Sequence, residues 1–113
     1  MNPVHAFRRR FEADLPDMQQ RGLPHYHAWA FAGTRQLGAA FELAALNLAW
    51  LQANGLGGFD AAIAAFTQVA NLNKTFILKG ARAVNAKRAF DGEAMFAEMA
   101  QAWDQGMAAL RAA

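Results

Sequence analysis

Apolar and polar positions recur at helical spacing along most of the chain. In the first segment they predict one apolar helix face over residues 3–20, formed by Val4, Phe7, Phe11, Leu15 and Met18. Asn2 before Pro3 is typical of a helix start, and Gly22 is typical of a helix end. Pro16 predicts a kink in this helix, or a split near Asp14, because proline removes a backbone hydrogen bond.

The segment 24–54 is apolar on every face. Between Ala28 and Leu51 its strongly polar side chains are few: Thr34, Arg35, Gln36, Glu42 and Asn47. A helix of this kind lies inside a protein or a membrane. A central arginine disfavours the membrane, so we expect the buried central helix of a globular domain.

Two further helices are predicted after the glycine-rich loop at 55–58. They cover residues 60–88 and 91–112, and Asp60 and Asp91 stand where N-capping residues are expected. The fold class is therefore all-α. We expect a single domain over 1–113 that forms an antiparallel, up-down-up-down four-helix bundle. Its two long central helices, 24–54 and 60–88, form a hairpin over which the first and last helices pack.

Composition narrows the classes of function. The 113-residue chain contains no cysteine, which excludes disulfides, thiolate metal sites and cysteine nucleophiles within it. The first residues lack the apolar run of a secretory signal, so we expect a cytoplasmic protein outside the membrane. The sequence is 55% hydrophobic, yet its first and last helices are short. Part of the hairpin should therefore stay uncovered, which predicts a homodimer or a docking face for a protein partner.

A candidate polar site centres on Arg35 and Glu42, which lie two helical turns apart and share a face. Folding the hairpin about its loop places Glu42 near Asn71 and Lys74, and Arg35 near Lys79. We expect Glu42 to be largely buried and within reach of one of these partners. Two interpretations remain open: an internal ion-pair network that fixes helix register, or a polar pocket for a ligand or for a partner's charged group.

Basic residues crowd the second half of the segment 60–88. They are Lys74, Lys79, Arg82, Lys87 and Arg88. No aromatic residues interleave with them as in a single-strand reader, and the net charge is only +2, so we do not expect nucleic-acid binding. An acidic protein partner fits these basic residues better. The candidate binding residues are Arg35, Glu42, Asn71, Lys74, Lys79 and Arg82.

The sequence gives little evidence of a metal or cofactor site. His25 and His27 point about 200° apart on a helix, so they cannot share one metal ion. The sequence has no phosphate loop, no serine–histidine–aspartate motif and no Glu-x-x-His motif for a di-iron bundle. We therefore expect no metal, no cofactor and no catalytic residue in this chain.

Three stretches carry a family resemblance: NPVHAFRRRFEADLP, TRQLGAAFELAALNLAWL and ARAVNAKRAFDGEAMFAEMAQAWDQGMAAL. Together they resemble the C-terminal part of a proteobacterial family, domain-of-unknown-function family 1839. The resemblance implies longer relatives with an N-terminal region that holds a cysteine in an Asn-Cys-Tyr context. It also implies genes near amino acid:carrier-protein ligases, and hence a role in moving an aminoacyl group from a carrier protein. For this cysteine-free sequence it implies a helical domain that supports or docks.

The sequence thus predicts a non-catalytic accessory or protein-interaction domain. The alternative is a domain that binds a small molecule or an aminoacyl-carrier protein, in a polar pocket near Arg35 and Glu42. A freestanding enzyme is a third, less favoured class.

Overall fold

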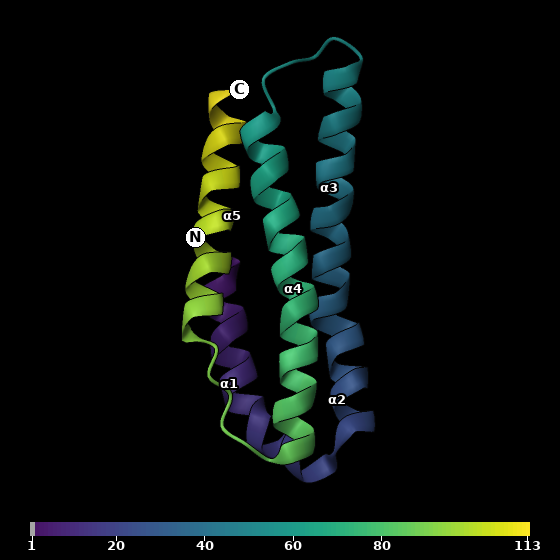
Figure 1. Ribbon diagram of the computed structural model, residues 1–113, viewed down its shortest axis with the longest axis vertical. Coiled ribbons are helices and arrows are strands. Elements are labelled where there is room, and N and C mark those ends of the chain that lie inside the picture. Colours follow the sequence, from purple (N-terminus) through teal and green to yellow (C-terminus); the bar gives the residue numbers. More distant parts are fainter. Residues whose placement is uncertain (1) are drawn as a thin grey trace.

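The computed structural model describes residues 2–113 as helices joined by short connections (Figure 1). In chain order they are α1 (Pro3–Arg21), α2 (Leu23–Ala30), the π-helical turn η1 (Phe31–Arg35), α3 (Gln36–Ala53), α4 (Asp60–Ala86) and α5 (Glu93–Ala112). No strand occurs within residues 2–113, which confirms the all-α class. The predicted segment 24–54 corresponds to α2, η1 and α3, which follow one another without a break.

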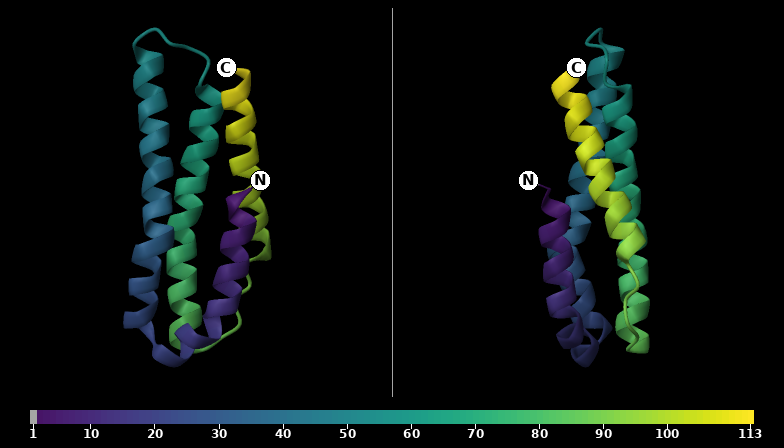
Figure 2. Two further views of the ribbon diagram at one scale, coloured as in Figure 1. Left: turned by 180° about the vertical axis from the view of Figure 1, so that it is seen from behind. Right: turned by 90° about the vertical axis from the view of Figure 1, so that its left-hand side faces the viewer.

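The helices form an elongated rod of 51 × 22 × 18 Å. α3 and α4 lie side by side along the upper part of its long axis, and α2 continues the line of α3 below (Figures 1 and 2). α1 covers the lower part of this assembly and α5 the upper part, with an overlap near the middle. α4 packs against every other helix, whereas the backbone of α3 comes close only to those of α4 and η1.

The segment 24–54 is not the buried centre of the molecule, so that prediction is wrong. In α3 only Gly38 and Ala45 are buried. α4 contributes ten buried residues instead, and it is the true central helix. The physical reason is that α1 and α5 pack against α4, while no helix among residues 2–113 covers the outer side of α3.

The main core is an aromatic cluster between α1, α2, α4 and the start of α5. Phe11 is completely buried, and its ring lies 4.8 Å from those of both Phe76 and Phe90 in edge-on contacts. A second, smaller core around Phe66 and Ala45 joins α3 and α4 to the end of α5. Edge-to-face aromatic packing adds to the burial of apolar area. These two cores hold α4 in place and leave the outer side of α3 free.

The helix ends agree with the sequence in part. The Asn2 side chain accepts a hydrogen bond from the Val4 amide and donates one to the Ala100 carbonyl, which confirms the cap and ties α1 to α5. Gly22 ends α1 with a φ of 90°, a conformation that suits glycine. α1 passes through Pro16 as one helix, without the alternative split.

The two predicted aspartate caps are wrong. Asp60 is the first residue of α4 and accepts a hydrogen bond from the Gln52 side chain, whose oxygen in turn accepts one from the Phe59 amide. α5 begins only at Glu93, after Gly92, without a side-chain cap. The Gln52 side chain, and not that of Asp60, therefore hydrogen-bonds to the backbone at the start of α4.

Candidate functional site

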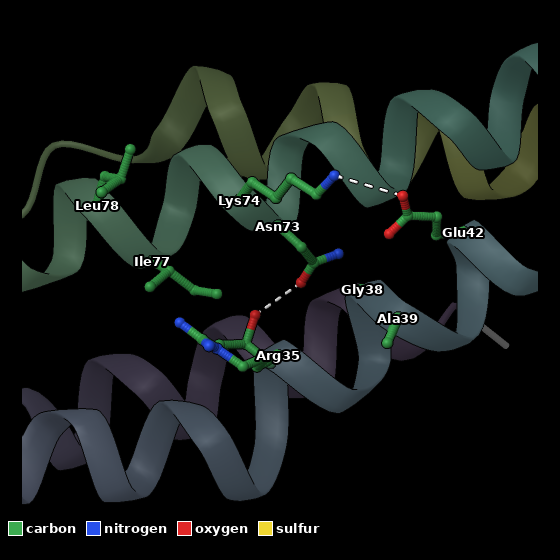
Figure 3. Close-up of a pocket in the computed structure, with 9 residues that line it drawn as sticks. Arg35, Gly38, Ala39, Glu42, Asn73, Lys74, Ile77 and Leu78 are labelled. Carbon is green, nitrogen blue, oxygen red and sulfur yellow. Dashed lines mark hydrogen bonds and ion pairs between the residues drawn. The ribbon is translucent and has the colours of Figure 1, made fainter.

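A groove of about 420 Å³ runs between η1–α3 and α4 (Figure 3). It opens on the side of the helix pair away from α1 and α5, which lie behind the pair in this view. Its lining comes from two facing helix edges: Thr34, Arg35, Gly38, Ala39 and Glu42 on one, and Asn73, Lys74, Ile77 and Leu78 on the other. Three of the six predicted site residues, Arg35, Glu42 and Lys74, thus line one groove.

The floor of the groove is a buried polar pair. The Thr34 hydroxyl donates to the Asn73 side-chain oxygen over 2.7 Å, and the Asn73 amide donates to the Val69 carbonyl over 2.9 Å. Both side chains are buried. A Cβ added at Gly38 would stand 3.1 Å from the Asn73 Cβ, so glycine permits the close approach of the helices here. The buried side-chain polar groups of the floor therefore have hydrogen-bond partners.

The π-helical turn η1 positions this site. Such a turn inserts one residue into a helix and is frequent at functional sites. It spans Phe31–Arg35, so it carries Thr34, whose side chain is buried toward α4, next to Arg35, which is exposed. In α2, the helix that precedes η1, the buried Tyr26 hydroxyl donates a hydrogen bond of 2.8 Å to the Ile77 carbonyl of α4. Burial raises the pKa of the Tyr26 phenol well above its ordinary value.

Glu42 faces water, so the prediction that it is largely buried is wrong. Its oxygen lies 3.6 Å from Lys74 Nζ, and both side chains are more than half exposed. A pair of this kind contributes under about 1 kcal/mol, because water screens it. Within residues 2–113, Arg35 has no carboxylate within ion-pair distance. The expected internal ion-pair network is therefore absent from this part of the chain.

The groove continues toward the α3–α4 loop as a second hollow of about 220 Å³. Glu42 lines both hollows and Asn71 lines the second, together with small or apolar residues such as Ala45, Leu46 and Ala49. Large apolar side chains stand exposed on η1, α3 and α4. They are Phe31 (61% exposed), Leu43 (58%), Leu46 (62%), Trp50 (65%) and, on α4, Leu78 (62%). We call Phe31, Leu43, Leu46 and Trp50 the apolar strip.

Lys79 and Arg82 do not belong to the groove. They line a separate hollow of about 410 Å³ at the α4–α5 connection, with Asn85, Arg88 and Asp91. The six predicted residues therefore fall in two places. Sequence reasoning did not bring Thr34 together with Asn73, and it assigned the apolar strip to a buried helix.

Within residues 2–113 no three histidine, aspartate or glutamate side chains gather closely enough to hold a metal ion. His25 lies 3.7 Å from an Asp17 carboxylate oxygen, at the α1–α2 junction. Each helix within residues 2–113 is too short or too polar to span a bilayer.

Comparison with models of known families identifies the family of this chain. The model of the family described as "DUF1839 C-terminal domain" matches residues 1–112, which confirms the resemblance drawn from the sequence. No curated protein and no solved structure matches the chain.

Proposed function

We propose that this chain, which belongs to the DUF1839 C-terminal domain family, is a non-catalytic helical domain that binds another polypeptide on the open face of α3 and α4. We infer that the chain is an antiparallel, up-down-up-down bundle in which α1 and α5 share one side of the α3–α4 pair. The opposite side is then the docking surface. As an accessory domain it would act in the cytoplasm.

The apolar strip is the observation that supports this proposal. Its four large side chains are each more than half exposed on one helical segment. Burying such a side chain is worth roughly 1.5–3 kcal/mol, and contiguous exposed apolar surface marks interaction sites. If the apolar strip stayed in water, the protein would not gain this stabilisation.

The shape of the surface favours a helix as the bound element. Small residues line the groove and the second hollow, among them Gly38, Ala45, Ala49 and Ala70. Leu46 and Leu78 add exposed apolar side chains to the lining, and Arg35 and Lys74 add charged groups. An amphipathic helix that lays its apolar face into a groove uses such a surface.

Cross-linking tests the proposal. A photoreactive amino acid replaces Leu46, and the protein is irradiated in an extract of its native source. We expect a defined cross-linked polypeptide at this position and none when the probe replaces Asp104, which is exposed on α5. Equal labelling at the two positions, or none at either, would remove the proposed docking surface.

A second candidate rests on the opening of the groove beside Arg35. A volume of about 420 Å³ is within the range of small-molecule sites, so a small molecule or an aminoacyl-carrier protein is the alternative ligand. Within the described residues, however, no buried side-chain polar atom lacks a partner, so no unsatisfied buried group points into the groove to orient a ligand. Nuclear magnetic resonance titration with an aminoacyl-pantetheine thioester tests this alternative. Shifts confined to Thr34, Asn73 and Lys74 would favour it over the polypeptide.

A further inference from the structure

Two pairs of exposed residues on η1 and α3 lie symmetrically about Gly38 and Ala39. Arg35 lies three residues before Gly38, and Glu42 lies three residues after Ala39. Phe31 lies seven residues before Gly38, and Leu46 lies seven residues after Ala39. Each pair thus combines groups that attract each other: a cation with an anion, and two large apolar side chains.

This arrangement fits a two-fold axis. In an antiparallel helix pair related by such an axis, a residue before the midpoint faces its counterpart after the midpoint on the other copy. We propose that two copies of this chain associate through antiparallel η1–α3 segments that cross at Gly38–Ala39, so that Arg35 of each copy pairs with Glu42 of the other. This inference rests on the proposed function, because it names the polypeptide that covers the docking surface.

The charges support a second copy as the occupant. Arg35 is exposed and has no carboxylate partner among residues 2–113. Glu42 has only Lys74, at 3.6 Å and in contact with water. Arg35 and Glu42 are about 10.5 Å apart along a helix axis. A second copy in antiparallel orientation offers the opposite charges at the same spacing, and the pairing is made twice.

The side chains at the crossing allow the two helices to come close. Gly38 is buried toward Asn73, and Ala39 is exposed with a side chain of one carbon. The small side chain of Ala39 permits close contact at the midpoint, and a shallow crossing of about 20° keeps neighbouring turns in contact. Phe31 of one copy then packs against Leu46 of the other, at both ends of the crossing. The polar pairs lie between these apolar contacts.

A charge-swap experiment tests the dimer. Sedimentation velocity measures association of the wild type, of Arg35→Glu, of Glu42→Arg and of an equimolar mixture of the two variants. We expect the wild type to dimerise, and each variant alone to bind itself about a hundredfold more weakly or worse, because like charges then face each other twice. The mixture should form a heterodimer, since its chains carry opposite charges at all four positions.

Controls separate charge pairing from general effects. Arg9→Glu on α1 and Asp104→Arg on α5 make matched charge reversals at exposed positions away from the strip, and they should dimerise like the wild type. Circular dichroism checks that every variant keeps its helices. A monomeric wild type at high concentration, single variants that dimerise normally, or a mixture that stays monomeric would each overturn the inference. A monomeric wild type that still cross-links to another protein through Leu46 would leave the proposed function standing and overturn only the second copy as the occupant.

Discussion

The Thr34 hydroxyl donates a hydrogen bond of 2.7 Å to the Asn73 side-chain oxygen, and both side chains are buried where η1 meets α4. This contact fixes the register of the two long helical segments at the floor of the groove. It takes the place of the ion-pair network that the sequence suggested for Arg35 and Glu42.

Replacing Thr34 by valine should therefore be costly. The change keeps the shape of the side chain but leaves the buried Asn73 oxygen without a donor, at a cost of about 1–3 kcal/mol. Chemical denaturation of Thr34→Val, Asn73→Leu and the double variant measures the coupling. We expect the double variant to lose less stability than the two single losses added together. Strict additivity would mean that the two side chains do not interact.

Glu42→Ala should be mild. Glu42 is exposed and its one ion pair is screened, so the free energy of unfolding should fall by less than about 1 kcal/mol. Glu98→Ala on α5, where an exposed glutamate accepts a hydrogen bond from Gln68, provides the matched comparison. Denaturation at low protein concentration measures the free energy of unfolding of both variants. A loss of several kcal/mol for Glu42→Ala alone would mean that Glu42 belongs to a buried ion-pair network, and this would contradict the structure.

Two glycines on facing helical segments should respond to alanine in opposite ways. A Cβ at Gly80 would clash with the ring and hydroxyl of the buried Tyr26, so Gly80→Ala should cost about 1–3 kcal/mol. A Cβ at Gly33 meets nothing within 4 Å, and Gly33→Ala should stabilise by roughly 0.5–1 kcal/mol through the lower entropy of the unfolded chain. Thermal denaturation compares the two. Equal effects would show that α2 and α4 are not in close contact at Tyr26.

The single tyrosine should make stability fall in alkali. Burial raises the pKa of Tyr26 above its ordinary value of 10.0. The folded state therefore holds this proton to a higher pH than the unfolded chain does. Its contribution to stability is complete below pH 10.0 and declines as the pH rises toward the folded-state pKa. Tyr26→Phe should show a shallower decline above that pH.

The ultraviolet absorbance of tyrosinate provides a direct check on that prediction, because the chain contains one tyrosine. Its appearance should coincide with unfolding. A tyrosinate signal that rises near the ordinary pKa while the helices persist would mean that Tyr26 is accessible to water.

The sequence predicts the helical class well, because spacing and end signals agree at Asn2, Pro3 and Gly22. It assigns the centre of the fold to the wrong helix, because an apolar helix has the same sequence pattern whether its own chain or another chain covers it. Leu43, Leu46 and Trp50 look like core residues in the sequence and are exposed in the structure. The π-helical turn at Phe31–Arg35 leaves no signal in the sequence, so the burial of Thr34 and the exposure of Arg35 could not be predicted. The hairpin register was close enough to bring Arg35, Glu42 and Lys74 into one groove, but not to show that they face water.

The central claim is that protein covers the open face of α3. Hydroxyl-radical footprinting with mass spectrometry measures it directly, in dilute purified protein and in native extract. Leu56, in the α3–α4 loop and 57% exposed, is the internal control, since it is as exposed as Leu43 but lies outside the strip. We predict that Leu43, Leu46 and Trp50 lose reactivity in the extract while Leu56 does not. Undiminished reactivity of all three residues in the extract would contradict the account.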